Sequence, residues 1–352
     1  MDIVNVHGGD IYSFEKFSEK HIIDFSVNIN PLGVSKNIKK AIEKSIYDTE
    51  RYPDMYCREL RGKIAEKENV GRDNVICSNG AAELIYGVVS AVRAKRVLIA
   101  VPSFSEYENA ARAFGAEVIY YEMREEDGFE IRDDIIGWLD NEVDIAFLCS
   151  PNNPDGKMIK KELLEKIIEK CDERGIIAVI DESFIEFVCG GEKLSAAGYC
   201  KERSSLFVIR SFTKIYAIPY IRLGYGICGN VDIIKKIYKV LPPWNVSGIA
   251  QAVGVAAISE KEYVKKTREY VKSEREFIEN EFKKMGIKYF KSEADFILFK
   301  WEKEKADKLI DMGILIRKCG NYRGLDEKFF RTAVRKHEDN VKLINCMKNI
   351  GV

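Results

Sequence analysis

One ten-residue segment brings together several side chains that could do chemistry. The run SLFVIRSFTK at 205–214 has an apolar half that ends at Arg210 and then presents Ser211, Thr213 and Lys214. In open α/β sheets, ligands bind beyond the carboxyl ends of the strands, so these side chains would face a ligand. The hydroxyls are phosphate-type donors, and a lysine there could form a Schiff base because burial and nearby cations lower its pKa. A solvated loop lysine is the alternative, since most lysines are surface residues.

Two further features could bind the same anion. Arg222, eight residues after Lys214 in the run IRLGYG, supplies a fixed cation. The run SNGAAE at 78–83 joins a strand to a helix through small residues, so the amides of Ala81 and Ala82 would point at an anion above the helix N-terminus. A tight strand-to-helix turn without a ligand would have the same sequence.

Two other expected strands end in polar residues. The run DIAFLCSPNNPDG at 144–156 ends in a proline-bracketed turn that holds Asn153, and the apolar strand after residue 176 ends in Asp181. An acid that follows five apolar residues is costly to bury without a cationic partner. Asp181 therefore either caps a helix or meets a cation, such as the protonated ring nitrogen of pyridoxal phosphate.

The elements that must position these residues alternate along the chain. Short β-branched runs alternate with amphipathic stretches, which predicts a mostly parallel sheet between helices. The expected strands are 75–77, 96–101, 117–121, 144–149, 176–181, 205–210 and 223–228. The expected helices are 81–93, 104–114, 160–174 and 231–240.

The pattern changes after Pro242-Pro243. A long charged helix is expected at 248–282, and it precedes short strands at 295–300, 314–317 and 329–334. We therefore expect an α/β fold with three parts. These are an N-terminal arm at 1–45 that packs with the small domain, a large domain at 46–241 with a seven-stranded sheet, and a small α+β domain at 242–352.

Composition excludes several classes of protein. The 352 residues include 56 basic and 56 acidic side chains, which argues against disorder and against nucleic acid as a partner. Nine cysteines without a CxxC pair and only three histidines make a metal site improbable and fit a reduced, cytoplasmic protein. No signal peptide or membrane span is expected. The glycines at 224–229 match GxGxxG but lie inside an apolar run, so we expect no nicotinamide site.

The order and spacing of these motifs resemble the fold-type I pyridoxal-phosphate enzymes over nearly the whole chain. The resemblance implies that Lys214 carries pyridoxal 5′-phosphate, that Asp181 pairs with its pyridine nitrogen, and that Asn153 contacts its ring hydroxyl. Phe104, in PSFSEY, would stack on the ring. It further implies a homodimer with shared sites, in which the cofactor phosphate meets Ala81, Ala82, Ser211, Thr213, Arg222 and, from the neighbouring subunit, Tyr52 of RYPD.

Two groups of these enzymes compete, the threonine-phosphate decarboxylases of cobalamin synthesis and the histidinol-phosphate aminotransferases. Phe184 stands where such aminotransferases often have a tyrosine, so the usual hydroxyl to the cofactor oxygen is missing. Phe184 fits the decarboxylases better, as do four motifs: HGGDIY at 7–12, FSVNINPLG at 25–33, PPWNVSG at 242–248 and ILIRKCGNYRGL at 314–325.

Both groups bind a phosphorylated amino compound, and the C-terminal part supplies cations. If 329–334 is a strand, alternation puts Arg331 and Arg335 on one face, toward the cleft. By resemblance, Arg331 would bind the substrate carboxylate, and Arg317 with Arg323 and His7 would bind the substrate phosphate. Asn30, in the motif at 25–33, is also expected to contact substrate.

The expected reaction is decarboxylation of L-threonine O-3-phosphate to (R)-1-amino-2-propanol O-2-phosphate. The first alternative is transamination of histidinol phosphate. The second is a non-catalytic pyridoxal-phosphate-binding regulator, which should carry a basic DNA-binding module, and the α/β pattern begins too early in the chain to leave room for one.

Overall fold

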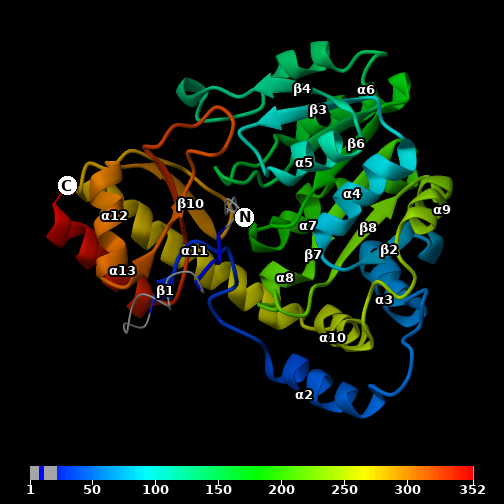
Figure 1. Ribbon diagram of the computed structural model, residues 1–352, viewed down its shortest axis with the longest axis horizontal. Coiled ribbons are helices and arrows are strands. Elements are labelled where there is room, and N and C mark those ends of the chain that lie inside the picture. Colours follow the sequence, from blue (N-terminus) through cyan, green and yellow to red (C-terminus); the bar gives the residue numbers. More distant parts are fainter. Residues whose placement is uncertain (1–7, 12–21, 352) are drawn as a thin grey trace.

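A large sheet of seven strands forms the centre of the protein. The computed structural model describes residues 8–11 and 22–351. The strand order is β2-β8-β7-β6-β5-β3-β4, with β8 antiparallel to both neighbours and the remaining pairs parallel (Figure 1). The strands are β2 (Val75–Ser78), β3 (Arg96–Val101), β4 (Glu117–Glu122), β5 (Ile145–Cys149), β6 (Ile177–Asp181), β7 (Leu206–Ser211) and β8 (Gly224–Cys228). The predicted mostly parallel sheet is confirmed, with each strand boundary within one residue.

Helices cover both faces of this sheet because its strands are apolar on both sides. In β5, Ile145, Phe147 and Cys149 pack into one apolar cluster, while Ala146 and Leu148 pack into another on the opposite face. Strand residues alternate between faces, so a continuous apolar run predicts a strand buried on both sides. The first face carries α4 (Ala81–Val92), α5 (Glu106–Ala113) and α9 (Val231–Val240), and the second carries α3 (Arg58–Glu68) and α6 (Lys161–Arg174).

Shorter elements connect this layer structure. The short helices are α7 (Gly191–Leu194) and α8 (Phe212–Ile215), and 3₁₀ segments occur at Ile46–Asp48, Arg72–Asn74, Glu125–Asp127, Asp133–Trp138, Ile185–Phe187 and Ala196–Lys201. The turn into α8 matters most for function, because Ser211 ends β7 and its side chain accepts a hydrogen bond from the Thr213 amide.

The C-terminal part forms a second, antiparallel sheet of order β12-β13-β10-β9, flanked by helices (Figure 1). Its elements are α10 (Gly248–Ile258), α11 (Lys261–Lys284), β9 (Tyr289–Phe290), β10 (Phe296–Lys300), α12 (Lys303–Asp311), β11 (Ile314–Leu315), β12 (Arg317–Lys318), β13 (Phe329–Ala333) and α13 (His337–Ile350). The combination of a large parallel layer with a small α+β layer agrees with the predicted fold class.

Two predicted elements of this part are each divided in the structure. The single helix expected at 248–282 ends at Ile258, where the Ser259 hydroxyl donates to the Ala256 carbonyl, and a second helix begins at Lys261. The strand expected at 314–317 is two strands in two sheets: β11 pairs with β1 (Ile23–Asp24), and β12 pairs with β13.

The N-terminal segment contacts more than one part of the protein. Through β1 it adds a parallel strand to β11, while α2 (Lys36–Ser45) packs against α10. No helix in the described ranges combines the length and hydrophobicity needed to cross a membrane. The nine cysteines are free thiols, and Cys189 is exposed.

Candidate active site

A cavity of about 470 Å³ opens at the carboxyl edge of the large sheet. Its volume is in the usual range for sites that bind small ligands. Strand ends and helix starts supply its lining, since β5, β6 and β7 all end at this edge and α4 begins there. Eleven of the predicted site residues line it: Ala81, Ala82, Phe104, Asn153, Asp181, Ser211, Thr213, Lys214, Arg222, Arg317 and Arg331.

A larger cavity of about 920 Å³ lies elsewhere and is a weaker candidate. Many of its charged groups are already paired: buried Arg210 donates to the neighbouring Glu182 at 2.8 Å and lies 3.4 Å from Glu186, which also meets Lys67 and Arg268. A site whose charges are already satisfied has little to offer a charged ligand.

One end of the first cavity is built to hold an anion. The Ser211 and Thr213 hydroxyls lie 2.7 Å apart, and the first turn of α4 points its amides at the same space. Arg222 reaches this end across the turn at Gly80, where φ is 81°. A Cβ atom on Gly80 would lie 2.4 Å from Arg222 Nη2, so only glycine admits the guanidinium there.

The glycines of the GxGxxG match have a packing role. Gly224 and Gly226 lie within strand β8, as predicted, whereas Gly229 follows the strand, just before α9. A Cβ on Gly224 would lie 2.6 Å from the Ala81 nitrogen, and one on Gly226 would lie 2.6 Å from Phe207 Cζ. The missing side chains let β8 approach the start of α4, which is how they contribute to the anion site.

Asp181 lines the cavity, and both of its carboxylate oxygens accept hydrogen bonds. Its Oδ1 accepts from the Ser183 amide at 2.9 Å and its Oδ2 accepts from the Tyr107 hydroxyl at 2.8 Å. Burial raises the pKa of this carboxyl, while the hydrogen bonds from Ser183 and Tyr107 and the charge of Lys214 oppose the rise. A buried carboxylate in this setting is stabilised further by a cation in the cavity.

Lys214, on α8, has the electrostatics of a reactive amine. Burial lowers its pKa to about 8, with the charges of Arg331 and Arg222 acting in the same direction and Asp295 and Asp181 opposing them. Its Nζ lies 5.9 Å from the centre of the Phe184 ring. An amine with this pKa is neutral often enough near neutral pH to attack a carbonyl carbon.

Two arginines from the C-terminal part reach the cavity. Arg331 Nη1 donates to Asn153 Oδ1 and its Nη2 donates to the Ser26 carbonyl at 2.9 Å. Its Nε has no hydrogen-bond partner among the described residues. Arg317, at the start of β12, donates to Asn321 and lies 5.6 Å from the centre of the Tyr322 ring.

Comparison with known proteins agrees with this geometry. The sequence model of a family described as aminotransferase class I and II matches residues 20–345. The chain belongs to this family. Its members depend on pyridoxal phosphate.

Individual relatives of the family carry two different names. The chain is 40% identical to a protein of Caldanaerobacter subterraneus subsp. tengcongensis provisionally named threonine-phosphate decarboxylase, over 98% of the chain and 93% of that protein. It is 31% identical to the threonine-phosphate decarboxylase of Salmonella typhimurium, over 98% of the chain and 96% of that protein. Among solved structures, the histidinol-phosphate aminotransferase of Clostridium acetobutylicum matches with a TM-score of 0.87 at 33% identity, covering 93% and 98% of the two chains.

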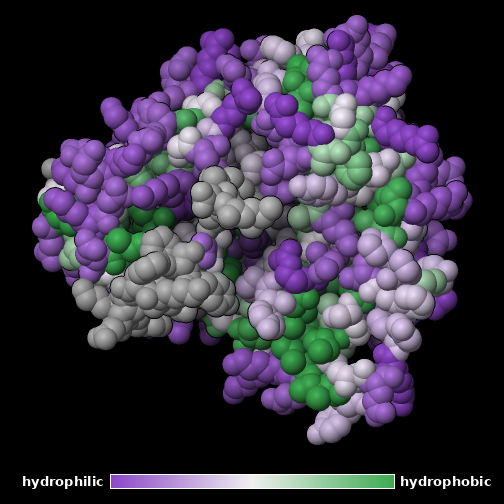
Figure 2. All heavy atoms as spheres, in the orientation of Figure 1, coloured by the Kyte–Doolittle hydropathy of each residue, from purple (hydrophilic) through white to green (hydrophobic). Residues whose placement is uncertain are grey.

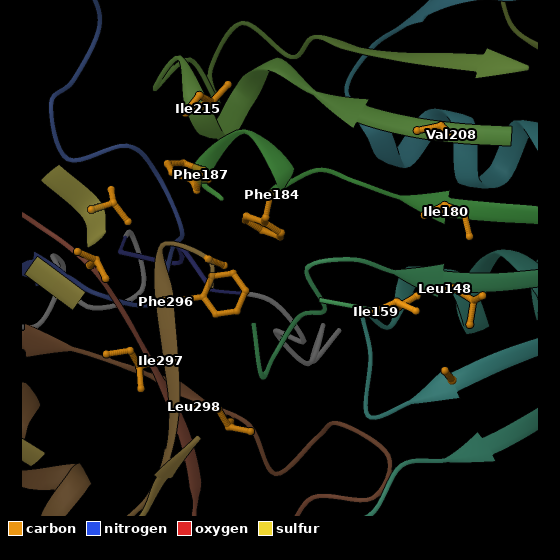
Figure 3. Packing of buried hydrophobic residues seen from close by; sticks show 14 of the residues in the cluster. Leu148, Ile159, Ile180, Phe184, Phe187, Val208, Ile215, Phe296, Ile297 and Leu298 are labelled. Carbon is orange, nitrogen blue, oxygen red and sulfur yellow. The ribbon is translucent and has the colours of Figure 1, made fainter. Parts of the chain in front are cut away.

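The residues present fit the cofactor of the class I and II aminotransferases. Amides, two hydroxyls and a guanidinium offer donors to a phosphate, Asp181 offers a carboxylate to a protonated ring nitrogen, and Lys214 offers an amine to the aldehyde. Phe104 lines the cavity and offers an aromatic ring to it. Phe184 faces Phe296 with ring centres 5.0 Å apart, so the place of the family tyrosine is apolar here (Figure 3).

Two predicted substrate residues lie outside the cavity. Asn30 is buried, and its Nδ2 donates to the Ile215 carbonyl at 2.6 Å and to the Tyr263 and Thr267 hydroxyls at 2.8 Å, so it anchors the helix that carries Lys214. Arg335 donates to the Asp24 carbonyl at 2.9 Å instead. Strand β13 ends at Ala333, so the alternation expected to align Arg335 with Arg331 does not extend that far.

The three remaining predicted site residues are Arg323, Tyr52 and His7. Arg323 is partly exposed and lies 3.8 Å from the centre of the Tyr120 ring, outside the cavity. Tyr52 is 83% exposed, with its ring 4.8 Å from that of Trp244, and it does not line the cavity. His7 lies outside the described residues.

Sequence reasoning missed several residues at this site. Tyr107 and Tyr322 donate to Asp181 and Asn153. Asp295, which is fully buried, raises the pKa of Lys214. The signal for Asp295 was present, because it is an acid beside the apolar run FILF, like Asp181 after its own strand.

Proposed function

We propose that this protein binds pyridoxal 5′-phosphate through Lys214 and decarboxylates L-threonine O-3-phosphate to (R)-1-amino-2-propanol O-2-phosphate, a step of cobalamin biosynthesis. The observation that carries the proposal is a second cationic group, Arg317 with Arg331, in the same cavity as the anion-binding end that contains Arg222. The cavity thus has cations for the cofactor phosphate, a substrate phosphate and a carboxylate. Similarity to the Salmonella typhimurium decarboxylase over 98% of the chain supports the same substrate.

Asp181 and Lys214 have different roles in the proposed reaction. When bound, the cofactor supplies an electron sink for the pair left at the α-carbon when the carboxylate departs as carbon dioxide. Asp181 holds the proton on the ring nitrogen, and Lys214, once protonated, gives a proton to the α-carbon in place of the lost carboxylate. The bond from the α-carbon to the carboxyl carbon breaks and a carbon–hydrogen bond forms, so the step needs no further reactant.

The role of Arg331 is limited by energetics. Tight binding of the departing carboxylate stabilises the ground state as much as the transition state, so it does not raise the rate of decarboxylation. We therefore assign Arg317 to the substrate phosphate as the main source of binding energy. Arg331, already fixed by Asn153 and Ser26, orients the carboxylate.

The second candidate is transamination of histidinol phosphate, favoured by the structural similarity to the Clostridium acetobutylicum enzyme. Lys214 would then take a proton from the α-carbon rather than give one to it. The test is carbon dioxide release from L-threonine O-3-phosphate by cofactor-loaded protein without an oxo acid, with Lys214→Ala as control. Amino transfer from histidinol phosphate to 2-oxoglutarate without carbon dioxide release would contradict the proposal.

We also propose a homodimer. Aromatic and aliphatic side chains are exposed near the predicted subunit contact, at Ile46, Tyr47, Tyr52 and Trp244. Figure 2 shows apolar side chains gathered around α2 and α10 on this part of the surface. Patches of this kind mark protein interfaces. The domain boundaries at 45 and 241 and the cytoplasmic location stay predictions.

A further inference from the structure

Tyr107 is a buried residue to which neither the motifs nor the proposed mechanism gives a role. It lies on α5 and is 0% exposed. Its ring stacks on Phe147, with centres 5.0 Å apart and planes inclined by 8°, and meets the edge of Phe104 at 5.8 Å. These contacts hold the ring in place, and its hydroxyl donates to Asp181 Oδ2 at 2.8 Å, with the Cys149 thiol as a second neighbour.

The phenol keeps its proton in this position. Burial raises the pKa of Tyr107 well above its ordinary value, and the charge of Asp181 raises it further. Tyr107 therefore acts as a permanent donor to Asp181. Since Ser183 donates to the other oxygen, the protein supplies donors to both carboxylate oxygens, and lone pairs remain for a cation.

We propose that Tyr107 is a positioning residue that sets the orientation and basicity of Asp181 toward the ring nitrogen of the cofactor. The inference rests on the proposed cofactor but not on the choice of substrate. A donor to a carboxylate weakens its affinity for a proton. With Tyr107 in place, the proton shared by Asp181 and the ring nitrogen stays on nitrogen, where it strengthens the electron sink.

Other titratable groups also face Asp181 and Tyr107. Cys149, on β5, lies beside them, but burial raises the pKa of its thiol well above the ordinary value, so it stays neutral. Lys214 faces Asp181 from α8. In the loaded protein this lysine is bound to the cofactor, so it is the group whose titration is observed.

Tyr107→Phe tests the proposal because it removes the hydroxyl and keeps both ring contacts. The measurement is a pH titration of the visible absorbance of the lysine-bound cofactor. Loss of the donor draws positive charge off the ring nitrogen, so the imine nitrogen should hold its proton to higher pH. Removal of one hydrogen bond to a charged group predicts an upward shift of about one pH unit.

Tyr121→Phe is a matched control. Tyr121 is also buried, and its hydroxyl donates to Asp134 Oδ1 at 2.5 Å, yet it does not line the cavity. Its titration should equal that of the unmodified protein. An unshifted midpoint in Tyr107→Phe would overturn the proposal, as would loss of far-ultraviolet circular dichroism, which would show a purely structural role. Absence of a visible band in the unmodified protein would instead refute the proposed cofactor, and a band without decarboxylation would refute only the proposed reaction.

Discussion

The amine of Lys214 gives the most quantitative prediction. Its pKa of about 8 lies below the ordinary value of 10.5. At pH 7 about one amine in ten is then neutral, against about one in three thousand for an ordinary lysine, a gain of about 300-fold. Only the neutral amine attacks an aldehyde, so cofactor capture by cofactor-free protein should accelerate as pH rises and level off above about pH 8.

Asp295→Asn perturbs this amine without changing the shape of the side chain. Asp295 is 0% exposed, and neither of its carboxylate oxygens has a hydrogen-bond partner in the described ranges. Burial raises its pKa to about 7, so above that pH it is charged and raises the pKa of Lys214. In this variant, the rate of cofactor capture should therefore reach half of its maximum at a lower pH than in the unmodified protein. Arg331→Gln removes a cation and should move the midpoint upward.

The assay is stopped-flow absorbance of cofactor binding to cofactor-free protein between pH 6 and pH 10. Opposite shifts for the two variants would support the account of the Lys214 environment. A midpoint near 10 in the unmodified protein, or an unchanged midpoint in Asp295→Asn, would refute the reasoning.

Three further predictions concern the turn at Gly80 beside Arg222, the buried hydrogen bonds of Asn30, and the binding of the substrate phosphate by Arg317. Gly80→Ala should raise the dissociation constant of the cofactor at least tenfold, because its Cβ would displace Arg222. An equilibrium titration measures this constant, and an unchanged value would contradict the role of Arg222 in binding the cofactor phosphate. Asn30→Ala should lower the free energy of unfolding by about 2 kcal/mol, because it removes buried hydrogen bonds; denaturant titration checks this, and full stability with lost turnover would point to substrate contact instead. Arg317→Gln should raise KM for L-threonine O-3-phosphate about a hundredfold with a smaller change in kcat; steady-state kinetics measures both, and an unchanged KM would remove Arg317 from the substrate site.

The sheet could be predicted from the sequence because its strands are short, apolar and buried on both faces. The location of a site residue could be predicted wherever a polar residue ends an apolar strand, as Asp181 and Ser211 do, since the topology then places it at the carboxyl edge of the sheet. The prediction that Arg335 and Arg331 share a strand face was wrong, because β13 ends at Ala333. Arg335 instead donates to the Asp24 carbonyl.

Other parts of the site depend on tertiary packing and left weaker signals. Tyr107 reaches Asp181 from a helix 74 residues away in sequence, and nothing in the run PSFSEY distinguishes its hydroxyl from that of a surface tyrosine. Asn30 was assigned to substrate from a motif, yet its amide donates to groups from α8 and α11. A motif can thus mark a structural anchor as well as a ligand contact.

The most direct test of the proposed reaction follows one carbon atom. Cofactor-loaded protein is mixed with 2-oxoglutarate and L-threonine O-3-phosphate labelled with carbon-13 at the carboxyl group, and the label is followed by NMR. The account predicts that the label appears as carbon dioxide and bicarbonate while 2-oxoglutarate is unchanged. Retention of the label in an organic acid, together with formation of glutamate, would contradict it.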